Sequence, residues 1–277
     1  MVANYPTQTT DTVFNFKDKV VVITGGVSGI GRATAEMFAK ADANVAVLDL
    51  DDTEGKVFAE DVGMFIHTDV SHEIDVARAI QTVVATFERI DVLVNNAGIE
   101  FNDRGNLIDM PREDMRRIIE VNLFGYINMV RACVPHMRPG SKIVNVSSVQ
   151  GLAAHAPGTS YQIAKSSILG LTHSLAIELA PKGINVNTVI PGAIKTEGMG
   201  AVRASSSSIL DPYRRRIPLA RRGWAAEVAG PILFLSSSLA NYMTGSTLVV
   251  DGGYLINLTP DMGGEVPTHG QAEDPDL

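Results

Sequence analysis

A short stretch near the amino terminus decides the fold: residues 20–31 read VVVITGGVSGIG. The apolar run 20–23 has the length of a buried strand, and the glycine turn 24–31 opens a helical pattern that continues to about Lys40. Glycines let the backbone turn sharply and approach a pyrophosphate, and free N–H groups at the helix start attract that anion. Unless it is a plain strand-to-helix turn, Gly-x3-Gly-x-Gly predicts a dinucleotide site formed by Gly25, Ser28, Gly29, Ile30 and Gly31.

In the rest of the chain, short apolar runs alternate with longer amphipathic stretches. Further strands are predicted at 44–48, 63–67, 92–95, 142–147, 185–190 and 247–250. Helices are predicted at 74–89, 112–137, 160–179 and 225–237. Near-continuous apolar strands separated by helices predict an α/β fold, with a doubly wound, Rossmann-type, mostly parallel sheet of seven strands and helices on both faces. No linker divides this pattern, so a single domain is expected.

Three segments depart from the alternation of strands and helices. Residues 1–15 are polar, and we expect them to be flexible. Within the expected dinucleotide-binding catalytic domain, 16–258, residues 196–223 interrupt the alternation and are predicted to form a lid over the active site. Residues 259–277 form an acidic tail rich in Pro and Gly, which is expected to be disordered or to lie over a neighbouring surface.

The composition argues against several classes of protein. The 277 residues carry a net charge of −8, which disfavours broad binding to nucleic acid. Cys133 is the single cysteine, so an intrachain disulfide is impossible, and no Cys–His spacing suggests a metal. The sequence starts without a secretory signal and has no apolar run of membrane-spanning length. A soluble, cytoplasmic protein is therefore expected.

An acidic residue bears on the choice of dinucleotide. Asp49 ends the second predicted strand, eighteen residues after Gly31. A carboxylate at this place can accept hydrogen bonds from ribose hydroxyls and would repel a 2′-phosphate, so NAD is favoured over NADP. Arg32, inside the start of the helix, is a weaker candidate for binding such a phosphate. The alternative is that Asp49 is a solvated acid beside Asp51 and Asp52.

A candidate catalytic group lies further along the chain. Tyr161 and Lys165 are four residues apart on a predicted helix and therefore project from one face. A neighbouring ammonium favours the phenolate and is expected to lower the pKa of the tyrosine, which suits proton transfer. Ser148, at the end of the predicted strand 142–147, could hydrogen-bond a substrate oxygen. Alone, Tyr-x3-Lys is common on solvated helices; combined with the glycine turn and Asp49, a coincidence is improbable.

Taken together, these motifs resemble the classical short-chain dehydrogenase/reductase family, over about residues 17–254. In chain order, the resemblance is carried by the glycine turn 24–31, Asn95-Asn96-Ala97-Gly98, Asn122, Asn145-Val146-Ser147-Ser148, Tyr161-x3-Lys165, Pro191-Gly192 and Asp251-Gly252-Gly253. The resemblance implies an enzyme that transfers a hydride between NAD and a secondary alcohol or ketone. It also implies a homo-oligomer, a tetramer or a dimer, and residues 118–134 and 160–179 point the same way because they look apolar on more than one face.

The resemblance also implies roles for individual residues. Tyr161 is the general acid/base, Ser148 positions the substrate oxygen, and Lys165 holds the ribose of the nicotinamide. Asn122 supports a water in a proton relay to Lys165. Further cofactor contacts are implied for the residues that flank the adenine, line the cleft or contact the nicotinamide: Asp69, Val70, Asn96, Ala97, Gly98, Pro191, Gly192, Ile194 and Thr196.

Polar side chains near the expected pocket bear on the substrate. Candidate lining residues are Glu100, Gln150, His155, Ile194, Met199 and Leu210. Fixed polar groups suit a substrate with several oxygens, so a polyol, sugar or hydroxylated cyclic alcohol is predicted. Alternatively, Glu100 and His155 lie in solvated loops. The run Arg214-Arg215-Arg216 could attract an anionic substrate, although such runs usually form a solvated surface.

Other functions remain open at this point. The same site could serve a 3-oxoacyl or hydroxysteroid-type reductase or dehydrogenase. The fold could also belong to a non-catalytic NAD-binding sensor or scaffold, although such a protein does not need Ser148, Tyr161 and Lys165. An enzyme that dehydrates or epimerises nucleotide sugars usually has a separate substrate domain, for which this chain has no room.

Overall fold

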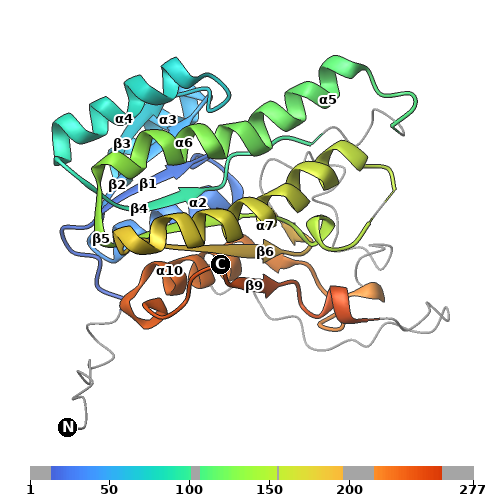
Figure 1. Cartoon of the computed structure of the whole chain (residues 1–277). Helices are drawn as coiled ribbons and strands as arrows, with labels where there is room; N and C mark the ends of the chain where they lie inside the picture. Colours follow the sequence, from blue (N-terminus) through green and yellow to red (C-terminus); the bar gives the residue numbers. More distant parts are fainter. Residues whose placement is uncertain (1–13, 101–106, 155, 196–214, 258–277) are drawn as a thin grey trace, which may run out of the picture.

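The computed structural model describes residues 14–100, 107–154, 156–195 and 215–257 (Figure 1). At its centre is a seven-stranded sheet in the order β3-β2-β1-β4-β5-β6-β9, in which every pair of neighbours is parallel. The strands are β1 (Val20–Thr24), β2 (Asn44–Asp49), β3 (Gly63–His67), β4 (Ile90–Asn95), β5 (Met137–Val146), β6 (Asn185–Pro191) and β9 (Thr247–Val250). Two short strands, β7 (Ile194–Lys195) and β8 (Gly223–Trp224), pair separately. The predicted doubly wound fold is confirmed.

Helices cover both faces of the sheet, and each face has its own hydrophobic core. On one face, α2 (Gly29–Lys40), α3 (Asp52–Val62) and α10 (Ala225–Ser236) pack against the strands. On the other face lie α4 (Glu73–Phe87), α6 (Gly125–Cys133) and α7 (Thr159–Leu179), and Figure 1 shows α6 and α7 crossing in front of the sheet. Because both faces are covered, the central strand β1 is buried along its whole length, and four of its five residues are apolar.

The strand order places the functional cleft. From β1 the chain winds outward through β2 to β3, and then returns to β4 on the other side of β1. Where the winding reverses, the connections after adjacent strands diverge and leave a crevice at the carboxyl ends of the strands. The glycine turn after β1 and the segment 96–100 after β4 both emerge at this crevice.

The predicted helix 112–137 is wrong in detail. It consists of α5 (Arg112–Ile119), a wide π-type turn (Glu120–Phe124) and α6, followed by a short 3₁₀ turn, and β5 then begins at Met137 instead of 142. The side chain of Asn122 accounts for part of the difference, since its Nδ2 donates to the carbonyl oxygens of Ile118 and Ile99, both at 2.9 Å. A side chain that takes a carbonyl of its own helix disturbs the regular ladder of hydrogen bonds.

Helix α3 was not predicted from the sequence. Its amino end is capped by the carboxylate of Asp51, which accepts from the N–H groups of Thr53 at 3.0 Å and Glu54 at 3.1 Å. In the sequence analysis Asp51 and Asp52 entered only as neighbours of Asp49, but acids directly after a strand also begin helices. The helix was missed because its sequence is short and its apolar residues follow the helical spacing only weakly.

Some predicted segments lie outside the described residues. These are almost all of the amino-terminal segment 1–15, the tail 259–277, and residues 196–214 of the lid. Among the helices that the structure does describe, none has the length and apolar character required to span a bilayer.

Candidate active site

A cleft of about 330 Å³ opens at the carboxyl ends of β1, β2 and β4. Ten of the residues predicted to bind a dinucleotide line it: Gly25, Ser28, Gly29, Ile30, Asp49, Asp69, Val70, Asn96, Ala97 and Gly98. Residues from four separate loops therefore meet at one elongated site, in the place that the strand order predicts.

Hydrogen bonds from the segment after β4 hold the glycine turn in shape. Asn96 Nδ2 donates to the carbonyl oxygens of Thr24 at 3.1 Å and Gly25 at 2.9 Å. In return, the Thr24 hydroxyl accepts from the N–H groups of Asn96 at 3.0 Å and Ala97 at 3.1 Å. The contact is so close that a methyl group added to Gly31 would lie 1.9 Å from the carbonyl oxygen of Gly25. Gly31 is therefore required by packing against the turn, and it does not line the cleft.

The carboxylate of Asp49 is fixed at the end of β2. Its Oδ2 accepts from Val27 N at 3.2 Å, and its Oδ1 accepts from Leu50 N at 2.7 Å. Arg32, the first basic residue after the glycine turn, is engaged elsewhere: its Nε lies 3.1 Å from Glu36, and its guanidinium lies 5.0 Å from the ring centroid of Phe58. The cleft therefore presents a negative group at the end of β2.

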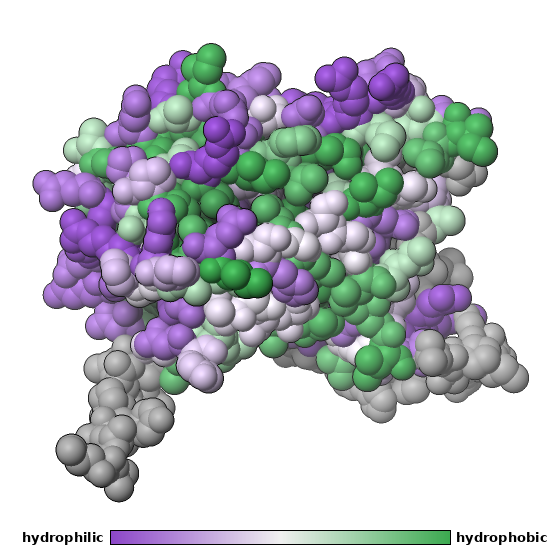
Figure 2. Space-filling model, in the orientation of Figure 1, coloured by the Kyte–Doolittle hydropathy of each residue, from purple (hydrophilic) through white to green (hydrophobic). Residues whose placement is uncertain are grey.

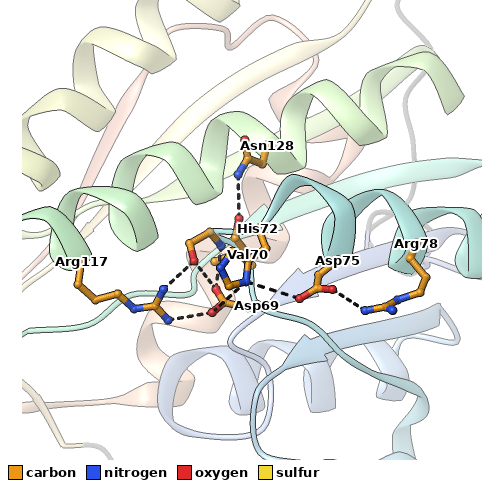
Figure 3. A network of polar contacts seen from close by, with 8 residues as sticks. Asp69, Val70, His72, Asp75, Arg78, Arg117 and Asn128 are labelled. Atoms are coloured by element: carbon orange, nitrogen blue, oxygen red, sulfur yellow. Dashed lines mark hydrogen bonds and ion pairs between the residues drawn. The ribbon is translucent and has the colours of Figure 1, made fainter.

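A polar network anchors the loop after β3, which forms another wall of the cleft (Figure 3). Asp69 Oδ1 accepts from Ser71 N at 2.9 Å and Ser71 Oγ at 2.6 Å, and Asp69 Oδ2 accepts from Arg117 Nη2 at 2.9 Å. Burial by itself would raise the pKa of Asp69, but the hydrogen bonds from Ser71 and Arg117 lower it to about 2. Asn128 of α6 adds a bond to Val70 O at 3.0 Å. The loop is thus tied to both α5 and α6.

Helix α7 carries Tyr161 and Lys165 one turn apart. Lys165 is buried, and its Nζ donates to Val146 O at 3.0 Å and contacts the Tyr126 hydroxyl at 3.3 Å. The same Nζ lies 5.6 Å from the ring centroid of Tyr161. Ser147 Oγ donates to the carbonyl oxygen of Lys165 at 2.7 Å, which fixes this turn of the helix against β5.

The pKa of Tyr161 departs from the sequence-based expectation. Burial, followed by the Glu100 carboxylate, holds the pKa of Tyr161 above its ordinary value, although a hydrogen bond from Ser148 acts in the opposite direction. Burial also lowers the pKa of Lys165 to about 8, against a smaller opposing effect of Glu100. The predicted lowering of this pKa by a neighbouring ammonium is therefore wrong here, because burial disfavours the phenolate and the Glu100 charge acts in the same direction.

Behind Gly98, which lines the cleft, lie the buried side chains of Asn122 and Lys165. Asn122 Oδ1 is buried and has no hydrogen-bond donor among the described residues. A methyl group added to Gly98 would lie 2.5 Å from this oxygen and 3.4 Å from Lys165 Nζ. The absence of a side chain at Gly98 thus leaves space that is bordered by an unpaired acceptor and by the lysine amine.

A second cavity of about 220 Å³ is lined in part by Ser148. Ser148, Gln150 and Gly192 line it, together with Arg216, the described end of the arginine run. Gln150 Nε2 donates to Glu100 Oε1 at 3.3 Å, and both residues are partly buried, so Glu100 does not lie in a solvated loop.

Other predicted site residues are placed less decisively or not at all. Pro191 is buried at the end of β6, and Ile194 is buried in β7 against Gly223; neither lines the two cavities. His155, Thr196, Met199, Leu210 and Arg214 lie outside the described residues. In the part of the chain that the structure describes, no three His, Cys, Asp or Glu residues cluster in a way that could hold a metal ion.

Two further site residues were missed by the sequence analysis. Tyr126 contacts Lys165 and donates to Val146 O at 2.9 Å, and Arg117 both lines the cleft and binds Asp69. Tyr126 lies four residues after Asn122, so the same-face spacing on one helix could have identified it. No local signal identifies Arg117, because its partner is 48 residues away.

Comparisons with known proteins agree with this architecture. A family model described as enoyl-(acyl carrier protein) reductase matches residues 25–255. An uncharacterized oxidoreductase of Thermotoga maritima is 40% identical over 250 residues, which cover 86% of this chain and 98% of that protein. The L-rhamnose 1-dehydrogenase (NAD(P)(+)) of Azotobacter vinelandii is 37% identical over 258 residues, covering 87% and 98%. The ligand-free aldohexose dehydrogenase of Thermoplasma acidophilum superposes with a TM-score of 0.81 at 34% identity, covering 90% and 99%.

Gly31→Ala tests the packing of the glycine turn. The added methyl group cannot fit beside the carbonyl oxygen of Gly25, so we expect the free energy of unfolding to fall by about 1–3 kcal/mol. The matched control is Gly230→Ala on α10, where no described atom lies within 4 Å of the added methyl group, and this change should leave stability unchanged or raise it. Urea denaturation measures both, and equal stabilities would contradict the prediction.

Proposed function

Because this chain belongs to the classical short-chain dehydrogenase/reductase family of oxidoreductases, we propose that it transfers a hydride between NAD and a secondary alcohol or ketone, with Tyr161 as the general acid/base. The observation that carries the proposal is the convergence of two separate parts of the chain. Ser148, just after β5, interacts with Tyr161 on α7, and Lys165, one turn further along α7, lies next to Gly98 of the cleft built on the glycine turn.

The residues of the cleft fit a dinucleotide. The bare backbones at Gly25 and Gly98 leave room that a side chain would fill, and the α2 amino terminus provides N–H groups for a pyrophosphate. Lys165 uses its Nζ on two protein oxygens, so an ammonium there has one hydrogen left for a ribose hydroxyl. When bound, NAD supplies the hydride acceptor and a positive charge beside the phenol.

NAD is preferred over NADP for an electrostatic reason. The Asp49 carboxylate is fixed by three backbone N–H groups, from Val27, Leu50 and Asp51, at the wall of the cleft where the adenosine ribose is expected to bind. A 2′-phosphate there would meet a like charge. Arg32, which could have neutralised the phosphate, is already paired with Glu36.

The proton path uses side chains that the fold holds in fixed positions. In the oxidation direction, Tyr161 Oη takes the proton of the substrate hydroxyl, and Ser148 Oγ positions that oxygen. Lys165 passes the proton onward to a water, and the unpaired Asn122 Oδ1 next to Gly98 suits such a bridging water as its acceptor. The buried position of Lys165, with a pKa of about 8, leaves it able to exchange a proton near neutral pH.

The substrate that suits this site is a polyol, a sugar or a hydroxylated cyclic alcohol. Ser148 and Gln150 line the second cavity, and Glu100 contacts Gln150, so the neighbourhood is polar. The names of the Azotobacter and Thermoplasma relatives also point to sugars. Arg216, which falls within the predicted lid 196–223, lines the same cavity, so residues of this segment are proposed to contact the substrate. If the protein oxidised only the 3-hydroxyacyl or steroid members of a panel of alcohols, a 3-oxoacyl or hydroxysteroid-type reductase or dehydrogenase would be favoured instead.

Tyr161→Phe tests the acid/base role. Removal of the hydroxyl should lower kcat/KM for NAD-linked alcohol oxidation by roughly 100- to 10,000-fold, because the proton has no acceptor. Binding of NADH, followed by its fluorescence, should change little. The control is Tyr242→Phe, at a fully exposed position, which should retain activity. A Tyr161→Phe variant with normal turnover would refute the role, and NADH binding without turnover in the wild-type protein would indicate a sensor.

Asp49→Ala tests the choice of cofactor. Removal of the negative charge should reduce the preference for NAD over NADP, measured as the ratio of the two kcat/KM values, by roughly 10- to 100-fold. The ratio is informative because a general loss of protein stability would lower kcat/KM with NAD and kcat/KM with NADP by the same factor. Asp61→Ala, an exposed change on α3, should leave the ratio unaltered. An unchanged ratio in Asp49→Ala would show that another group excludes the 2′-phosphate.

We also propose that the chain forms a homo-oligomer through the face that carries α6 and α7. Figure 2 shows apolar side chains gathered on this face, and Phe124, Ile163 and Ile177 are 45%, 43% and 78% exposed. Exposed apolar side chains concentrated on one face are typical of protein interfaces.

Light scattering tests the assembly. We expect the mass of a dimer or tetramer of the 29.6-kDa chain, and Ile177→Glu should shift the population towards the monomer. Val57→Glu is the control, since Val57 is 63% exposed but lies on α3, on the opposite face of the sheet. A monomeric wild-type protein would exclude the proposed interface.

A further inference from the structure

We propose that Glu100 and Gln150 form a recognition site for a second hydroxyl group of the substrate, close to the carbon that is oxidised. The inference rests on the proposed function and adds to it the polarity that the substrate must present: hydrogen-bond donors at this point, as in a vicinal diol or a sugar.

The two residues join the cofactor cleft to the substrate cavity. Glu100 directly follows Ile99, which lines the cleft, and Gln150 lines the second cavity beside Ser148. Their side chains meet at 3.3 Å although they are 50 residues apart in the chain. The pair therefore stands where a substrate would extend from the reacting carbon.

Glu100 dictates which way the Gln150 amide points. A carboxylate only accepts hydrogen bonds, so Gln150 must direct its Nε2 towards Glu100, and the reverse orientation would bring two acceptors together. The amide oxygen, Gln150 Oε1, is consequently turned away from Glu100. It is buried and has no hydrogen-bond donor among the described residues.

The pair thus offers acceptors that lack donors. Besides Gln150 Oε1, the second carboxylate oxygen of Glu100 receives no hydrogen bond from the described residues, since the bond from Gln150 goes to Oε1. A buried acceptor without a donor is costly, and a ligand that supplies the donor recovers that cost. A substrate hydroxyl can donate here, whereas an ether, ester or carboxylate brings only further acceptors and would be disfavoured.

The site is near the reacting oxygen. Gln150 N donates to Ser148 Oγ at 3.2 Å, so the amide and the substrate-positioning hydroxyl belong to one short turn. The Glu100 charge acts on both Tyr161 and Lys165. It adds to the effect of burial in raising the pKa of Tyr161, and it opposes the larger effect of burial that lowers the pKa of Lys165. A hydroxyl group one or two bonds from the oxidised carbon is therefore the group that this pair would meet.

Two cyclic alcohols that differ only in a donor test the proposal. The probes are 1,2-cyclohexanediol and 2-methoxycyclohexanol, whose methyl ether keeps the oxygen but removes its hydrogen. With NAD, the wild-type protein should favour the diol by roughly 10- to 100-fold in kcat/KM. Glu100→Gln and Gln150→Met should each reduce that preference to within about threefold, mainly through KM of the diol, while NADH affinity stays the same.

Glu73→Gln is the matched control. Glu73 lies on α4, where it pairs with Arg131 at 2.9 Å on the exposed surface, so the same chemical change there should leave the diol preference intact. A wild-type protein that turns over both alcohols equally, or variants that retain the full preference, would overturn the recognition site while the proposed dehydrogenase function stands. A wild-type protein with no NAD-linked turnover on any alcohol would refute the proposed function, and the inference with it.

Discussion

The attachment of α7 to the carboxyl end of β5 is the constraint on which the site depends. Three buried hydrogen bonds make this attachment: Ser147 Oγ to Lys165 O at 2.7 Å, Lys165 Nζ to Val146 O at 3.0 Å, and Asn145 Nδ2 to Thr172 Oγ1 at 2.9 Å. The donors and acceptors are shielded from water, so breaking any one of them leaves an unpaired polar group in a dry environment. The relative positions of Ser148, Tyr161 and Lys165 follow from this fixed contact.

The site holds polar atoms that the fold leaves without partners. Asn122 Oδ1 and Gln150 Oε1 are both buried acceptors without donors among the described residues, and both lie beside the proposed catalytic group. Lys165 is held in a position where burial lowers its pKa to about 8. Each of these features reduces the stability of the folded protein, and each is relieved by a ligand with complementary groups. Unpaired atoms of this kind are therefore better evidence of a binding site than the volume of the cavity.

Regular secondary structure is interrupted where the site requires it. The π-type turn at Glu120–Phe124 carries Asn122, whose side chain bridges Ile99 and Ile118. Interruptions of this type inside helices frequently coincide with functional positions. Here the turn holds the Asn122 amide beside Gly98, which lines the cleft.

The sequence by itself determined the seven strands of the sheet, most of the helices, the glycine turn and the placement of Tyr161 and Lys165 on one face of a helix. Strands β3 and β9 match their predicted bounds, and these features could be predicted because burial, turn geometry and same-face spacing act over a few residues. Only the tertiary structure decided the π-type turn, the contact between Arg117 and Asp69, the Glu100–Gln150 pair and the raised pKa of Tyr161. Each of these depends on which residues distant in the sequence come into contact and on how far packing excludes water from them. A short stretch of sequence specifies neither.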